Sequence, residues 1–158
     1  MRRKDREVVC KEWMLSVLEE CEYLQLALCR EGVPYVVPMN YGIGDGYLVL
    51  HGAAEGQKID FLKSNPRAAF SAVAGAEIIR HPHDPSSYSS KYRCVCGSGT
   101  VRFLTDIGEK RAALELLMKH YNGPTSPMPD AMLQKLSVMR LDIEEMTGKV
   151  NGYENPDK

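Results

Sequence analysis

The sequence predicts one α+β domain built on a curved or closed antiparallel sheet, and three observations lead to this class. Short strand-like segments separated by glycine turns fill residues 23–52. Helical periodicities flank the strand-rich middle of the chain. The 158 residues show no internal repeat and no domain boundary. A meander of short strands favours closure because closure hides the strand edges. A chain of this length also buries enough surface to fold without disulfide or metal staples.

The first element is predicted to be a helix over residues 6–19. Asp5 is a suitable N-cap, and Val9, Trp13 and Val17 then follow at intervals of four residues. This spacing is typical of a helix with one apolar face.

An antiparallel meander follows this helix. Strands are predicted at 23–29, 35–41 and 47–51, joined by glycine-containing turns. Pro38 lies inside the second strand. Because proline cannot donate to a strand ladder, this strand is predicted to lie at a sheet edge or to contain a bulge.

The rest of the chain alternates between strands and helices. A glycine-bearing loop at 52–58 leads into a short helix that ends at Asn65-Pro66. Gly97 and Gly99 suit a bend or a close backbone approach in a long strand. The further predicted elements are a strand at 67–76, a loop at 81–90, a strand at 91–105, helices at 107–121 and 130–135, a strand at about 136–145 and a tail at about 150–158.

The charge pattern excludes several kinds of partner. Twenty Lys and Arg residues balance twenty-one Asp and Glu residues, and no basic stripe is present, which argues against nucleic acid. The longest stretch without a charged residue, 32–44, is too short to span a bilayer. No signal peptide is apparent at the N-terminus. We therefore expect a soluble, cytoplasmic protein that binds neither nucleic acid nor a membrane.

The five cysteines are predicted to be reduced, and most of them to be buried. Cys94-Val95-Cys96 and His81-Pro82-His83 are the two halves of a conceivable metal site. Neither pair has the two-residue gap of common zinc knuckles, so no metal site is predicted.

Residues 51–58, HGAAEGQK, carry the clearest chemical signal. A glycine-rich loop here feeds into a helix N-terminus, where free backbone N–H groups favour an anion such as phosphate. Lys58 falls in the first turn, where a cation is unfavourable unless an anion is bound beside it. The alternative is an exposed lysine on an ordinary strand-to-helix turn.

Residues 34–42 carry a second signal. Pro38 frees this strand from full pairing, Asn40 both donates and accepts hydrogen bonds, and Tyr41 is amphipathic. Such a strand suits a flat heteroaromatic ring. The alternative, which is compatible with the first, is an edge strand at a subunit interface.

A family resemblance joins these segments. The string PYVVPMNYG, a glycine turn and then LVLHGAAEGQKIDFLKSNP resemble the pyridoxamine 5′-phosphate oxidase-like split-barrel flavoproteins, and most closely their nitroimidazole-resistance-related subgroup. SKYR at 90–93, DIGEKRAALELLM at 106–118 and IEEMTGK at 143–149 also match. The resemblance covers residues 2–151. One departure is Cys94, which stands where the family often has serine.

The resemblance implies a single domain over residues 1–158, namely a six-stranded split β-barrel with flanking helices. It further implies a homodimer that binds FMN between its subunits. The implied ring-lining residues are Pro38, Met39, Asn40 and Tyr41. His51, Gly52 and Ala53 would lie beside the ring and the ribityl chain, and Gly56, Gln57 and Lys58 would hold the phosphate. Tyr92 and Arg93 would line the far side of the pocket, from the partner subunit.

The implied function is that of an FMN-dependent oxidoreductase, in which the flavin carries hydride. Nitroaromatics or related small molecules are the expected substrates, with nicotinamide nucleotides as donors. A B6 vitamer is disfavoured because no second basic cluster is present. His51 either donates a proton to the substrate or only packs and hydrogen-bonds. The alternative function is a flavin- or haem-binding protein without turnover.

Overall fold

A single antiparallel sheet organises the computed structural model, which describes residues 2–124 and 126–158. Its strands are β1 (Glu7–Val8), β2 (Leu24–Arg30), β3 (Val33–Met39), β4 (Tyr41–Gly44), β5 (Tyr47–Gly52), β6 (Arg67–Ile79), β7 (Ser89–Leu104) and β8 (Ser137–Asn151). They run in the order β3-β2-β6-β7-β8-β5-β4, and β1 pairs with β8 off this path. The predicted α+β class and antiparallel sheet are confirmed.

The strand count differs from the six that were expected. Eight strands are present in the described residues, and the path stays open between its two ends, β3 and β4. Two of the eight are short, because β1 has two residues and β4 has four. The predicted strand 35–41 is split at Asn40 between β3 and β4, which accounts for part of the difference.

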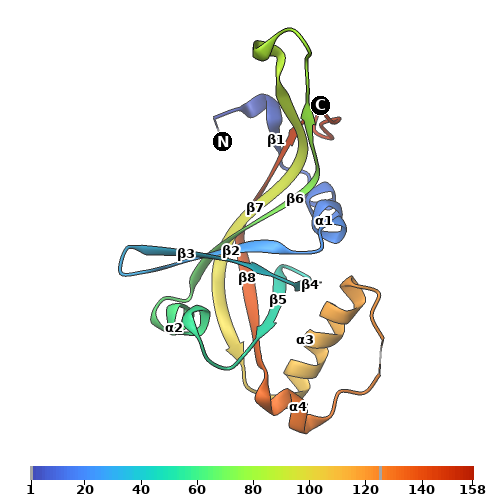
Figure 1. The fold of residues 1–158 in the computed structure, drawn as a ribbon. Helices are drawn as coiled ribbons and strands as arrows, with labels where there is room; N and C mark the ends of the chain where they lie inside the picture. Colours follow the sequence, from blue (N-terminus) through green and yellow to red (C-terminus); the bar gives the residue numbers. More distant parts are fainter. Residues whose placement is uncertain (1, 125) are drawn as a thin grey trace.

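The helices flank this sheet. They are α1 (Lys11–Glu20), α2 (Gln57–Ser64), α3 (Ile107–His120) and α4 (Asp130–Lys135), with 3₁₀ turns η1 (Lys4–Arg6) and η2 (Pro85–Ser87). In Figure 1, α3 and α4 lie at one end of the molecule, and β6 and β7 extend at the other as a hairpin arm. None of the helices in the described residues is long and apolar enough to cross a bilayer.

The predicted start of the first helix is wrong. The helix begins at Lys11, and Asp5 pairs with Arg3 where it was expected to cap. Glu7 and Val8 are extended because they pair with β8. Val8 is fully buried there, so burial of this side chain decides the local conformation against helical spacing.

The first hairpin confirms the role of Pro38. Glu31 and Gly32, with φ of 53° and 80°, make the tight turn that joins β2 to β3. β3 lies at one end of the strand order, so Pro38 occupies an edge as its missing N–H predicts.

The long hairpin of β6 and β7 confirms the reading of the two glycines. A Cβ at Gly97 would lie 2.5 Å from the Phe70 ring, and one at Gly99 would lie 1.9 Å from the carbonyl oxygen of Asp142. The β7–β8 register shifts between Ser98 and Gly99, so the sheet bends here. β6 and β8 are both longer than predicted, and β8 reaches into the expected tail.

Two apolar clusters make up the core. The larger lies between α1, α2 and the sheet, and includes Leu18, Leu24, Tyr41 and Leu62. The smaller lies under α3 and α4. α3 is capped by Asp106, whose carboxylate accepts the N–H of Glu109 at 2.9 Å. The 130–135 helix is confirmed.

Candidate functional site

Lys58, Met39 and Gly52 meet where β3, β5 and α2 come together. The ammonium Nζ of Lys58 lies 3.1 Å from the thioether sulfur of Met39. A Cβ at Gly52 would lie 2.7 Å from the same nitrogen, so a side chain here would displace the Lys58 ammonium from its present position. The structure therefore brings together residues from the strand 34–42 and from the loop 51–58, the two segments with the clearest chemical signals.

The Lys58 ammonium has no anionic partner in this site. Among the residues that the structure describes, its one hydrogen-bond partner is Met39, and a thioether is a weak acceptor. Burial lowers the pKa of Lys58. A half-buried charge is costly unless it is paired, so the site favours an anion beside this amine.

The loop before α2 presents backbone N–H groups to the same region. Gly56 precedes the helix with φ of 113° and has no side chain to cap it. Its carbonyl accepts the N–H groups of Ile59 and Asp60, whereas Gln57 and Lys58 stand in the first turn, where N–H groups lack helical partners. A Cβ at Gly56 would meet nothing within 4 Å, so the space is open. The free N–H groups of the first turn and the open space beside Gly56 both fit a phosphate group.

His51 lies next to this site on β5, in register with Val138 of β8. Burial, and then the charge of Lys58, lower the pKa of His51. Its imidazole is therefore held neutral at neutral pH, with one ring nitrogen that donates and one that accepts.

Asn40 and Tyr41 occupy the junction between β3 and β4. The Asn40 amide donates to the carbonyl of Glu22 at 3.2 Å. The Tyr41 side chain is fully buried, and its hydroxyl donates to the carbonyls of Leu18 at 2.5 Å and Cys21 at 3.1 Å. Burial raises the pKa of Tyr41. The structure thus places the Tyr41 ring in the core beside the end of α1, while the backbone of this junction stays next to Met39.

The end of α3 supports this junction, which no local sequence pattern indicates. The Tyr121 hydroxyl donates to the carbonyl of Glu22 at 2.6 Å and accepts the N–H of Tyr41 at 3.0 Å. The His120 ring packs 4.7 Å from the Tyr41 ring. Helical spacing alone does not show which strand receives these two side chains.

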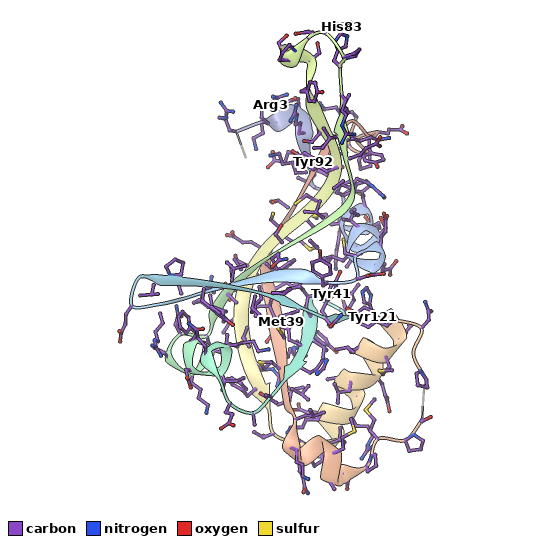
Figure 2. The ribbon with its side chains drawn as sticks, viewed as in Figure 1. Arg3, Met39, Tyr41, His83, Tyr92 and Tyr121 are labelled. Carbon is purple, nitrogen blue, oxygen red and sulfur yellow. The ribbon has the colours of Figure 1, made fainter. Side chains whose placement is uncertain are left out.

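Tyr92 and Arg93 lie elsewhere, on the hairpin arm. Figure 2 shows Tyr92 well apart from Met39 and Tyr41. Arg93 pairs with Glu20 at 2.7 Å and lies over the Tyr153 ring. Within one chain, the structure does not bring these two predicted residues to the Lys58 site. Of the other predicted residues, Pro38, Ala53 and Gln57 are exposed around it.

Comparisons with solved structures agree with this fold. A crystal structure from Bacteroides thetaiotaomicron, described as a candidate 5-nitroimidazole antibiotic resistance protein, is 30% identical with a TM-score of 0.82, over 91% of this chain and 86% of that one. An FAD- and haem-binding protein from Mycobacterium smegmatis shares the fold at 20% identity, with a TM-score of 0.84, over 97% of this chain and 77% of that one.

Two sequence comparisons match, one over part of the chain and one over most of it. An uncharacterised protein of Rhizobium meliloti is 34% identical over 62 residues, which are 39% of this chain and 40% of that protein, so the match spans well under half of the relative. The family model for pyridoxamine 5′-phosphate oxidase matches residues 11–150. The motifs, the open antiparallel sheet and this match lead to one conclusion: the chain belongs to the pyridoxamine 5′-phosphate oxidase family of split-barrel proteins.

Proposed function

We propose that this protein is an FMN-dependent oxidoreductase that acts on nitroaromatic or related small molecules. The observation that carries the proposal is the half-buried Lys58 ammonium, which has no anionic partner among the described residues and stands at the open N-terminus of α2. FMN ends in a phosphate, which would supply the missing charge. The description of the Bacteroides relative supports the substrate class, and that of the Mycobacterium protein supports a flavin.

In this proposal, different residues around Lys58 contact different parts of the flavin. Gly56, Gln57 and Lys58 hold the phosphate through backbone N–H groups and the ammonium. Gly52 and Ala53 border the ribityl chain. The isoalloxazine ring is contacted by Pro38, Met39, Asn40 and the backbone at Tyr41.

His51 is the titratable group to which we assign a role in the proposed reaction. The flavin, when bound, supplies hydride transfer. His51 enters as a neutral imidazole, so it holds a proton on one ring nitrogen and orients a ligand by donating a hydrogen bond. In this proposal the same nitrogen donates the proton that a substrate needs on reduction.

The flavin site is completed by a second copy of the chain. Within one subunit, Tyr92 stands apart from Met39, the residue that Lys58 contacts (Figure 2). Arg93 follows Tyr92 on β7. In a homodimer, these residues of one subunit would cover the flavin held by the other. A cleft between subunits also excludes water better than a site on one open sheet, which favours hydride chemistry.

An FMN titration tests the phosphate assignment. Lys58→Met keeps most of the side-chain volume and removes the charge, so we expect FMN affinity to fall about 10- to 100-fold, the worth of one charged hydrogen bond. Flavin fluorescence quenching measures this. Lys63→Met, in the last turn of the same helix, is the matched control and should leave affinity unchanged. Equal affinities for wild type and Lys58→Met would contradict the assignment.

Spectra of the purified protein separate the oxidoreductase from a binding protein. We expect two visible flavin bands, which bleach when NADH or NADPH is added without oxygen and return when a nitroaromatic is added. A bound flavin that neither nucleotide reduces would favour a binding protein without turnover. A sharp Soret band in place of flavin bands would favour haem.

A further inference from the structure

Two cysteines of β7 form a close thiol pair that the proposed flavin site does not use. Cys94 and Cys96 stand two residues apart on one strand, so both side chains project from the same face. Their sulfur atoms are 3.7 Å apart. The Ser71 hydroxyl of the neighbouring strand β6 lies 3.7 Å from the first sulfur and 3.6 Å from the second.

The pair borders an apolar cavity. The cavity has a volume of about 510 Å³ and lies between β6, β7 and β8. Its apolar wall comes from Val73, Ala76, Ile78 and Tyr92. Cys96 is exposed and Cys94 is half-buried, so a small molecule that enters the cavity reaches both sulfurs. The site therefore joins two thiols to a surface that suits an apolar substituent.

The surroundings favour a thiolate at Cys96. A hydrogen bond from the Cys94 thiol, helped by Ser71 and by the charge of Lys149, lowers the pKa of Cys96 to about 6. Lys149 is the register partner of Cys94 on β8. The same coupling, with burial, raises the pKa of Cys94. Cys96 is therefore the initial nucleophile. Cys94 keeps its proton until its sulfur bonds to the bound centre.

The spacing suits a bridging atom better than a direct disulfide. Two residues along an extended strand place Cα atoms about 6.6 Å apart, at the long end of the range found in disulfides. Closing the sulfurs to bond length would require the strand to move. In contrast, two sulfurs bonded at about 2.3 Å to one pyramidal or tetrahedral centre stand roughly 3.4–3.8 Å apart, so the observed separation needs little or no change.

The number of donors narrows the kind of centre. Within 2–124 and 126–158, no three side chains of His, Cys, Asp or Glu converge, whereas structural zinc takes four such ligands. The pair suits a centre that takes two sulfur ligands from the protein and already carries its third substituent. Monosubstituted trivalent arsenicals have this chemistry, because the arsenic carries one carbon substituent and takes two sulfurs.

We propose that Cys94 and Cys96 form a dithiol site that captures soft, thiophilic centres of the monosubstituted arsenic(III) type, with the organic substituent in the adjoining cavity. The step is a condensation without redox change. The arsenic–oxygen double bond of an organoarsine oxide breaks and two arsenic–sulfur bonds form. The oxygen leaves as water with the Cys94 proton and one proton from solvent, because the Cys96 thiolate has already released its own. The arsenic stays trivalent.

Phenylarsine oxide tests the site on the full-length protein in the presence of excess glutathione. We expect one phenylarsenic group per chain by intact-mass spectrometry, accompanied by loss of one water. Because the second bond forms within the molecule, we expect either Cys94→Ser or Cys96→Ser to lower the apparent affinity about 100-fold or more. Cys29→Ser removes an exposed thiol outside the pair and is the control, with affinity unchanged.

Two further measurements keep the outcome decisive. Circular dichroism melts show whether each variant is folded, and Cys96→Ser changes an exposed side chain, so it carries the test if Cys94→Ser does not fold. Proteolytic mapping of the wild-type adduct should locate the arsenic on the peptide that contains both cysteines. An adduct that survives in Cys96→Ser, maps to another cysteine, or is absent from the wild type overturns the proposal.

Discussion

Lys58 and His51 are two basic side chains held in one partly buried site. Burial lowers the pKa of both, and the ammonium of Lys58 lowers that of His51 further. Each therefore favours its neutral form more than it would in water, and an anion beside Lys58 would reverse part of this effect. A change in charge at Lys58 therefore shifts the pKa of His51.

The His51 pKa makes folding stability depend on pH. The unfolded chain takes up this proton near pH 6.5, and the folded protein takes it up at lower pH. Between these two pKa values the unfolded state binds more protons, so the free energy of unfolding falls as pH falls. We expect His51→Gln to reduce this slope below about pH 6.5 and to leave the slope above it as in the wild type.

Urea unfolding at several pH values from about 5 to 8 measures this slope. His83→Gln, at the exposed tip of the hairpin arm, is the control and should keep the wild-type slope. An unchanged slope in His51→Gln would show that the imidazole titrates alike in both states.

Residue patterns predicted one part of the site and not another. The glycine-rich loop before a helix is a local signal, and it located Lys58 because only neighbouring residues are involved. Tyr41 is different, because its ring turns into the core to satisfy two carbonyls near the end of α1. Those acceptors lie some twenty residues away in the chain. The alternation of residues along the strand at Tyr41 therefore does not predict these two acceptors.

At the scale of elements, the β7–β8 pair depends on a glycine that nothing else can replace. Gly99 sits at the register shift, with the Asp142 carbonyl in the place of any side chain. The sequence indicated this approach, because two glycines inside a long strand have no other local reason. The start of the first helix was predicted wrongly, because neighbouring residues do not reveal that Glu7 pairs with Lys149.

Gly99→Ala tests this element directly. A Cβ would lie 1.9 Å from the Asp142 oxygen, so the backbones of β7 and β8 must separate. We expect a loss of about 3 kcal/mol in the free energy of unfolding, at the upper end for overpacking. The control is Gly108→Ala in α3, where the nearest atom is Asp106 Oδ1 at 3.1 Å, so a shift of a few tenths of an ångström that keeps the cap to Glu109 relieves the contact. Urea melts compare the two, and equal small effects would contradict the close approach.

At the scale of the whole molecule, the proposed flavin site requires two chains. Lys58 lies at the junction of β3, β5 and α2, and Tyr92 lies on the arm. A two-fold dimer would use both surfaces twice. The arm also carries exposed apolar side chains, among them Ile79 and Tyr88.

Light scattering should give twice the chain mass of 17.7 kDa. Complementation then tests whether the site is shared. Lys58→Met and Tyr92→Ala should each bind FMN weakly as pure dimers. After the two are unfolded and refolded together, about a quarter of all sites should regain wild-type affinity, because half the dimers are mixed and each has one intact site. Fluorescence titration counts these sites. Full recovery, or none, would mean that Lys58 and Tyr92 do not belong to one intersubunit site.

The position of β8 has a consequence for how the chain is made. β8 pairs with β1, β5 and β7, and it joins β5 and β4 to the rest of the sheet. It also leaves the ribosome after the seven other strands of this sheet. Until β8 is made, the β4–β5 hairpin pairs with no strand of the β3-β2-β6-β7 part of the sheet. The joining contacts span most of the sequence, and such contacts form slowly because the chain must first close long loops. The sheet of the nascent chain therefore stays in separate parts until β8 has been made.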